Sequence, residues 1–184
     1  MQVKGTAVKP TMEFVKNRFP EKYDDWFNKL PESSQKIFRD KINVALWYPA
    51  TEAFLIPTKV IGELFYDNIE DAAFELGRYS AEIGLTGIYK IFIRIATPRF
   101  ILSRATNIFS SYYNPAFVKL NIQNEKLFHF YVYKFKKEDK PIAYRIAGWI
   151  NKALELTNCK DLTSEVEEIK ENNETVFKII SSWA

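Results

Sequence analysis

Basic side chains gather in the middle of the sequence with no acidic residue among them. The stretch from Ile83 to Asn124 contains no Asp or Glu, and its basic residues are Lys90, Arg94, Arg99, Arg104 and Lys119. Arginine presents a planar fork of N–H donors that matches a carboxylate or a phosphate. We therefore identify Arg94, Arg99 and Arg104 as candidates for binding the anionic head group of a ligand.

Aromatic side chains accompany these arginines. Tyr112 and Tyr113 follow Arg104 in the chain, and His129 and Tyr131 lie in a run of aromatic and β-branched residues further along. Small-molecule sites typically combine apolar and aromatic walls with a few polar groups. These four side chains complete the predicted set of ligand-binding residues.

Other interpretations of the same residues stay open. Arginines on amphipathic helices commonly pair with carboxylates or extend into solvent, and acidic residues gather between Glu63 and Glu75. A basic amphipathic helix can also lie on an anionic membrane, although the apolar face of this one has no Trp. For His129 the alternative to a general base or a metal ligand is a hydrogen-bonded structural role.

The segment that carries Arg99 and Arg104 is predicted to be an amphipathic helix over residues 97–113. On a helical wheel its apolar side chains share one arc, and these are Ile101, Leu102, Ala105, Ile108, Phe109, Tyr112 and Tyr113. Arg99, Ser103 and Asn107 lie on the opposite arc, with Arg104 at its edge. The arginines therefore project away from the apolar side of this helix.

The N-terminal half is predicted to be helical. Pro10, Pro20 and Pro31 each mark a helix start, because proline is tolerated in the first turn of a helix. Pro57 favours an extended conformation at Ile56, and the next helix is predicted from residue 58.

A long helical region over residues 69–95 follows. Each glycine in a helix interior costs about 1 kcal/mol relative to alanine. The glycines of this region, Gly77, Gly84 and Gly87, therefore indicate close packing against a neighbouring element.

After residue 115 the hydrophobic period changes to two, which is typical of strands. The sequence predicts strands at 118–122 and 127–135 with a turn at 121–125, a helix from 141 to about 158, and a hairpin at 164–183 that turns at ENNE. Hairpin-length connections join antiparallel strands, and the intervening helix must cover a sheet face. We expect one α+β domain over residues 1–184, with N-terminal helices and a helix-covered four-stranded antiparallel sheet in β-β-α-β-β order.

The strand from Leu127 to Phe135 is apolar on both faces. Phe128, Phe130 and Val132 point one way, while His129 and its alternating neighbours, also largely apolar, point the other way. We expect both faces of the sheet to be covered, one of them by the helix that starts near Pro141 and the other by the N-terminal helices, a ligand or a second subunit.

Composition limits the class of function. The 184 residues, 47% of them hydrophobic, suit a single domain with its own core, and a net charge of +3 is too small to indicate nucleic-acid binding. One cysteine and one histidine cannot make a protein-only zinc site, and no catalytic motif occurs. We expect a cytoplasmic protein that is not an enzyme and carries no cofactor.

Several short motifs carry a resemblance to known proteins, and they are VKG at 3–5, WYP at 47–49, ELGRYS at 75–80, the segment 97–115, IAGWINKALELTNC at 146–159 and VFKIISSW at 176–183. Along nearly its whole length the chain resembles a family of uncharacterised bacterial proteins best known from the Myxococcales. More distantly it resembles the superfamily that joins haem nitric-oxide-binding domains, 4-vinyl reductase domains and TRAPP transport subunits. The resemblance implies an α+β fold, a hydrophobic ligand cavity between sheet and helices, and frequent dimerisation.

The chain departs from each branch of that superfamily. Haem nitric-oxide-binding domains carry a histidine on a helix and a Tyr-x-Ser-x-Arg signature, whereas His129 lies in a predicted strand and Tyr79-Ser80-Ala81-Glu82 does not match the signature. The vinyl reductase relatives use several cysteines, and TRAPP-like subunits acylate one inside the cavity. Cys159, at a predicted helix end, is a poor match to either.

Two hypotheses of different classes follow. The leading one is a non-enzymatic sensory or carrier domain that binds a small apolar ligand between sheet and helices, with Arg99 or Arg104 meeting an acidic head group. The alternative is a homodimeric scaffold or protein-interaction module whose cavity is filled by its own side chains.

Overall fold

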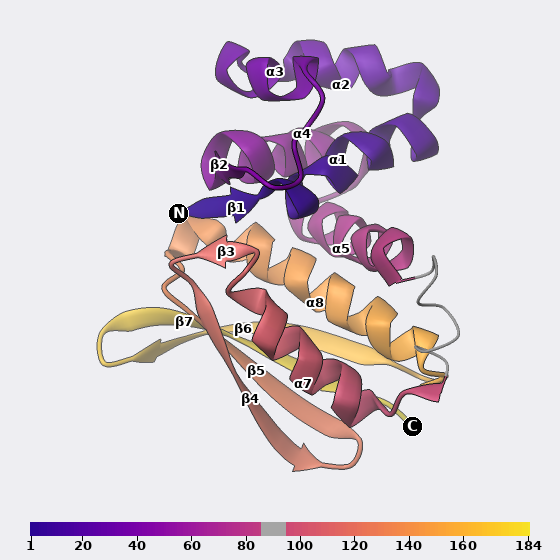
Figure 1. Cartoon of the computed structure of the whole chain (residues 1–184), viewed down its shortest axis with the longest axis vertical. Helices are drawn as coiled ribbons and strands as arrows, with labels where there is room; N and C mark the ends of the chain where they lie inside the picture. The colour runs from indigo at the N-terminus through magenta and orange to yellow at the C-terminus, as the bar shows by residue number, and fades with distance from the viewer. Residues whose placement is uncertain (86–94) are drawn as a thin grey trace.

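The helices of the N-terminal half form a layer at one end of the molecule, and a four-stranded sheet forms the other end, with two long helices between them (Figure 1). The computed structural model describes residues 1–85 and 95–184. Lys90, Arg94 and Gly87, which the sequence analysis singled out, lie outside the described residues. The arrangement confirms the predicted α+β class, with strands in the order β-β-α-β-β after the N-terminal helices.

The N-terminal layer contains four α-helices and two short turns of other helix types. They are α1 (Gly5–Arg18), the 3₁₀ turn η1 (Pro20–Lys22), α2 (Tyr23–Lys29), α3 (Glu32–Arg39), the π-helical turn η2 (Thr51–Leu55) and α4 (Ile56–Phe65). Pro31 stands immediately before α3, as predicted.

Two of the proline predictions were wrong. Pro10 lies inside α1, which already starts at Gly5, where the Gly5 N–H donates to the Leu46 carbonyl. Ile56 is helical, with Pro57 in the first turn of α4. The preceding turn η2 runs directly into α4 and buries Phe54 and its neighbours, so that packing outweighs the local preference of the residue before proline.

A small three-stranded sheet ties the N-terminus to the middle of the chain. Strand β1 (Gln2–Lys4) pairs antiparallel with β2 (Trp47–Pro49) on one side and with β3 (Tyr113–Asn114) on the other. In this register Val3 lies opposite both Tyr48 and Tyr113.

The main sheet has the antiparallel order β4-β5-β7-β6. Its strands are β4 (Phe117–Asn124), β5 (Leu127–Tyr133), β6 (Thr163–Glu171) and β7 (Glu174–Ser182). The β6–β7 hairpin turns at Asn172 and Asn173, whose φ angles of 50° and 64° suit the mirror-image turn that matches strand twist. The first hairpin turns at Glu125–Lys126, slightly later than predicted.

Helices α7 (Pro98–Phe109) and α8 (Lys140–Leu156) both cover the same face of this sheet. A 3₁₀ turn, η3 (Lys137–Asp139), leads into α8. Helix α7 packs on β4 and α8 packs on β6 and β7, while buried side chains of α7 and α8 contact one another. The face beneath them buries Phe128, Phe130 and Val132.

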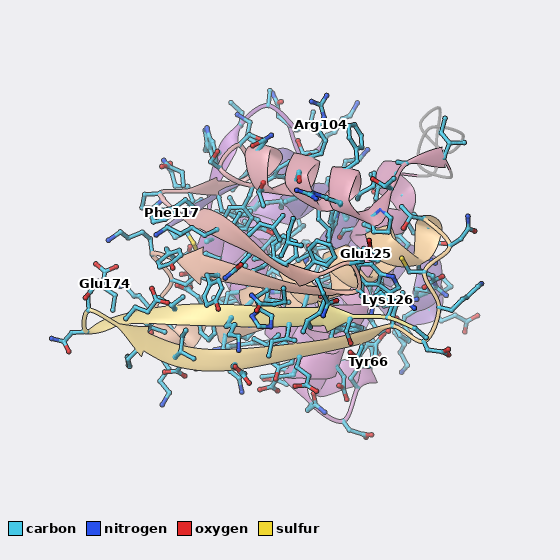
Figure 2. The ribbon with its side chains drawn as sticks, turned by 90° about the horizontal axis from the view of Figure 1, so that it is seen from below. Tyr66, Arg104, Phe117, Glu125, Lys126 and Glu174 are labelled. Carbon is cyan, nitrogen blue, oxygen red and sulfur yellow. The ribbon has the colours of Figure 1, made fainter. Side chains whose placement is uncertain are left out.

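No helix of the described residues covers the outer face of the sheet, which Figure 2 shows from below in front of the helices. The N-terminal helices therefore do not cover this second face, and cover by a ligand or a second subunit stays a prediction. Its aromatic side chains shelter one another instead: the Phe117 and Tyr133 rings stack with their centroids 4.8 Å apart. The stems of long polar side chains add cover, since Lys119 lies over the Tyr133 ring and Lys178 is only 20% exposed.

Helix α5 (Ile69–Leu85) crosses α8 at unusually close range. A Cβ atom on Gly77 would overlap the carbonyl oxygen of Arg145, and one on Gly148 would overlap that of Phe74. The predicted close packing is confirmed for Gly77 and wrong for Gly84, which has open space around it.

Candidate functional site

The guanidinium group of Arg145 is buried where α8 meets the N-terminal helices. Arg145 lies on α8 and is 3% exposed. Its Nη2 donates to the Ala7 carbonyl on α1 at 3.0 Å, and its Nη1 lies 3.5 Å from Oγ1 of Thr58 on α4. The group also stacks on Phe54, with 3.7 Å between Cζ and the ring centroid. We call this place the Arg145 junction.

No carboxylate in the described part of the chain forms an ion pair with Arg145. Burial lowers the pKa of Arg145 to about 9. The electrostatic interaction with Tyr113 acts in the opposite direction and raises this pKa, but by less. At neutral pH the group is still charged, because pH 7 lies below that pKa. Buried charges are normally paired. The guanidinium group of Arg145 is therefore unusual, because it is buried and charged but has no ion-pair partner among the described residues.

Tyr113 forms the aromatic wall beside Arg145. Its ring lies 6.1 Å from Phe54, 4.8 Å from Phe109 and 6.2 Å from Phe135, centroid to centroid. Burial raises the pKa of Tyr113 to about 12, so its hydroxyl is protonated and able to donate a hydrogen bond at neutral pH. The junction thus combines a fixed cation and a hydroxyl donor with apolar walls, which suits the head group of an apolar acid.

The two described arginines that the sequence singled out lie elsewhere. Arg99 and Arg104 are exposed on α7, on the arc that the helical wheel predicted. Arg104 lies 5.9 Å from the ring of Phe100, which is 57% exposed. Neither arginine has a carboxylate partner within the residues that the structure describes.

The remaining predicted residues divide between three places. Tyr113 is in the junction, and Tyr112 is half-buried beside it, where its carbonyl accepts the Lys4 N–H at 2.9 Å. His129 and Tyr131 lie half-buried on the outer face of β5. Burial and then the nearby charge of Lys178 lower the pKa of His129, so its imidazole is neutral at pH 7. The structure does not bring the predicted set together.

Sequence reasoning missed Arg145, although a signal was present. Arg145 stands three residues after Ile142 and one before Ile146, on the apolar side of the predicted helix. A charge at such a position is either paired inside the protein or functional.

The fold is that of the H-NOX proteins, the haem nitric-oxide-binding class. The chain is similar to the Fe(II) unliganded H-NOX protein from K. algicida, with a TM-score of 0.71, 15% identity, and coverage of 98% of this chain and 97% of that one. It is also similar to the H-NOX protein from S. oneidensis in the Fe(II)NO ligation state, with a TM-score of 0.68, 10% identity, and 98% and 99% coverage. No family model matches the sequence, and no curated protein matches it significantly.

The residues of this chain do not fit a histidine-bound haem. Haem iron is held by His, Cys, Met or Tyr side chains. The one histidine of the sequence is on the outer face of β5, and Cys159 is buried just beyond the end of α8, beside Thr157. In the junction the candidate is Tyr113, whose raised pKa opposes the phenolate that would bind iron.

The described residues contain neither a cluster of metal-binding side chains nor a membrane-spanning helix. Within residues 1–85 and 95–184, no three side chains of the His, Cys, Asp and Glu types converge to hold a metal ion. Over the same ranges, no helix combines the length and the hydropathy that crossing a bilayer requires.

Proposed function

We propose that this chain is a non-enzymatic sensory or carrier domain that binds a small apolar molecule with an acidic head group, and that Arg145 is the anchor of that head group. The observation that carries the proposal is the buried guanidinium without a carboxylate partner. The head-group role that the sequence analysis gave to Arg99 or Arg104 passes to Arg145, because those two arginines are exposed on α7.

Electrostatics supports an acidic ligand over a neutral one. Removing a charge from water without a partner is costly, and an anion that binds there recovers part of this cost through charge-assisted hydrogen bonds. The Tyr113 hydroxyl can add a further donor, while Phe54 and Phe109 supply apolar surface. The proposal therefore departs from the NO ligand named for the S. oneidensis protein, which carries no charge to pair with Arg145.

The domain binds its ligand without transforming it. Acid–base chemistry needs a group that titrates near neutral pH, and the pKa of Tyr113 lies at about 12. We place the protein in the cytoplasm, since its one cysteine is free.

Native mass spectrometry tests the proposal directly. We expect the purified protein to retain an additional mass of an apolar acid, and to lose that mass after extraction with organic solvent. Protein prepared with the Arg145→Met substitution should carry far less of it. A wild-type spectrum that shows the bare chain mass before extraction, together with no thermal shift across a panel of apolar acids, would overturn the proposal.

A homodimer through the outer sheet face is the second candidate, because that face carries half-buried aromatic rings and unpaired charges at its two edges. Among the described residues, Lys119 on β4 forms no ion pair with a carboxylate. Glu165 on β6 likewise forms no ion pair with a basic side chain. A two-fold axis parallel to the strands would place β4 of one copy over β6 of the other. Lys119 would then lie level with Glu167 of the second copy, with Glu165 of that copy the next residue on the same face of β6, and the Tyr131 rings would lie near the centre.

Light scattering distinguishes this candidate. A dimer of this kind should dissociate when either Lys119→Glu or Glu165→Lys is introduced, and should form again when both substitutions are combined. A wild-type monomer at micromolar concentration would eliminate the dimer and leave the ligand proposal untouched.

A further inference from the structure

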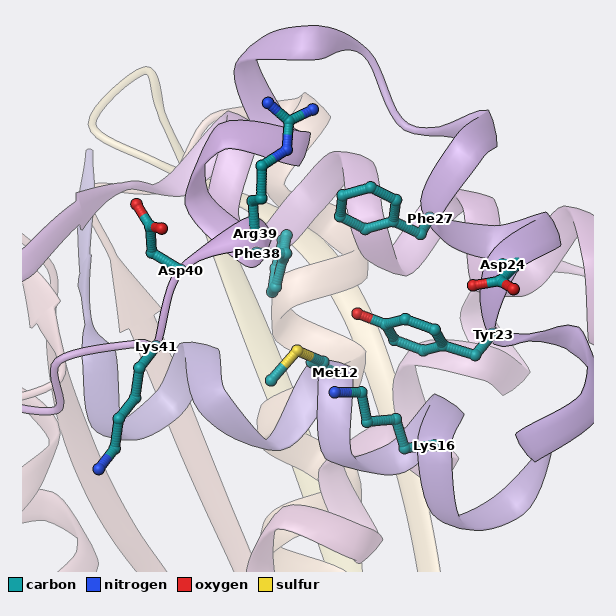
Figure 3. Close-up of a pocket in the computed structure, with 9 residues that line it drawn as sticks. All are labelled: Met12, Lys16, Tyr23, Asp24, Phe27, Phe38, Arg39, Asp40 and Lys41. Atoms are coloured by element: carbon teal, nitrogen blue, oxygen red, sulfur yellow. The ribbon is translucent and has the colours of Figure 1, made fainter.

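A hollow lies between the first three helices, and the Arg145 junction shares none of its side chains (Figure 3). The hollow is largely open to solvent, and its volume is about 460 Å³. Helices α1, α2 and α3 and the residues just after α3 all contribute to its wall. We call it the α1–α3 pocket.

The floor of this pocket is apolar and belongs to the core. Phe38 is 2% exposed and packs edge to face on Trp26, with 5.3 Å between the ring centroids. Trp26 is fully buried, and its indole N–H lies 3.3 Å from the Pro57 carbonyl that accepts its hydrogen bond. Met12 and Phe27 complete the floor. An aromatic ring could therefore stack on a surface that is already fixed.

Two polar side chains, exposed Lys16 and half-buried Tyr23, point into the hollow. Figure 3 shows the Tyr23 hydroxyl and the Lys16 ammonium group directed toward the space above Met12 and Phe38. Lys16 Nζ lies 4.7 Å from the centroid of the Tyr23 ring. Neither group has a hydrogen bond or an ion pair to any described residue. Burial raises the pKa of Tyr23, so its hydroxyl remains a donor at neutral pH.

Other lysines of these helices have carboxylate partners, which makes Lys16 an exception. The pairs are Lys9–Glu13 at 3.2 Å, Lys22–Asp25 at 3.1 Å, Lys29–Glu63 at 3.0 Å and Lys36–Glu32 at 3.1 Å.

The other charges around the pocket are also unmatched. Arg39 and Lys41 have no carboxylate partner within the described chain. Asp24 and Asp40 also line the pocket but pair with none of its cations, so three positive and two negative charges surround it. All five of these charged side chains are exposed, and their net charge of one positive unit favours an anion over a cation.

We propose that the α1–α3 pocket binds a small aromatic carboxylate. The ring lies on Phe38, Met12 and Phe27, and the carboxylate accepts hydrogen bonds from Lys16 and Tyr23. The Lys16 ammonium group and the Tyr23 hydroxyl, the two groups directed into the hollow, match a monocarboxylate. The polarizable sulfur of Met12 beside an aromatic floor favours an aromatic body over an aliphatic one.

Titration of ¹⁵N-labelled protein with phenylacetate tests this site. We expect amide shifts confined to α1, α2 and α3, and an affinity at least fivefold weaker in Lys16→Met. The matched control is Lys9→Met, which removes an exposed and paired lysine from the same helix and should leave the affinity unchanged. The unligated spectrum of each variant shows whether it folds as the wild type does.

Three results would each overturn the inference: shifts that map to other elements, equal binding of benzylamine and phenylacetate, or an unchanged affinity in Lys16→Met. Absence of any phenylacetate shift at millimolar concentration would do the same. Arg145→Met should bind phenylacetate as the wild type does. Failure of the proposal for the α1–α3 pocket can therefore be distinguished from failure of the proposal for the Arg145 junction.

Discussion

Gly148→Ala is expected to destabilise the protein by about 3 kcal/mol, measured as the free energy of unfolding in urea. The added methyl group would overlap the carbonyl oxygen of Phe74, and Gly77→Ala would meet the carbonyl of Arg145 in the same way. Backbone atoms of two packed helices have no room to move aside. The helices must therefore separate, which loosens the base of the Arg145 junction as well.

Gly84→Ala is the matched control for these substitutions. Gly84 lies on α5 like Gly77, but no atom lies within 4 Å of the position of its added Cβ. We expect Gly84→Ala to stabilise the protein by about 0.5–1 kcal/mol, because alanine is the better helix former. A similar loss of stability in Gly84→Ala and Gly148→Ala would contradict the close crossing of α5 and α8.

Arg145→Met is expected to raise the free energy of unfolding by roughly 1–4 kcal/mol in protein freed of ligand. Methionine fills a similar volume and can rest on Phe54, while the cost of burying an unpaired charge disappears. The control is Arg104→Met on the exposed side of α7, which should change stability by less than about 0.5 kcal/mol. A strongly destabilised Arg145→Met would show that the hydrogen bond to Ala7 makes this arginine a structural element.

The advantage of Arg145→Met should diminish at high pH. Burial lowers the folded-state pKa of Arg145 to about 9, below its ordinary value of 12.5, so the unfolded chain binds more protons between these two values. Stability contributed by this group therefore rises with pH above about 9, and the penalty is fully present below it. Comparing the two proteins at pH 7 and pH 10 cancels the titration of the other groups.

The main sheet could be predicted because its signals are local. The alternation around Phe128 and the Asn172-Asn173 turn each specify strand and hairpin within a few residues. The strands of the small sheet could not be found in this way, because β1 and β3 have three and two residues and their pairing joins Val3 to Tyr113 across most of the chain. Such a contact depends on tertiary packing.

The candidate site was harder to predict than the fold. The helical wheel correctly placed Arg99 on an exposed arc, but Tyr113, His129 and Tyr131 of the predicted set lie elsewhere in the structure. Arg145 matters because α1, α4 and β3 close around it, and no local pattern reports which side chains meet there. His129 lies on the outer face because successive side chains of β5 point to opposite faces of the sheet, and the sequence did predict this alternation.

A thermal-shift comparison of wild type and Arg145→Met tests the central claim most directly. The panel pairs apolar carboxylic acids of increasing chain length with the alcohols of the same length, so that each pair differs in the head group alone. We predict that at least one acid raises the melting temperature of the wild type, that its alcohol does not, and that Arg145→Met responds to neither. An acid that stabilises both proteins equally, or a wild type that responds to no acid, would contradict an anion-binding role for Arg145.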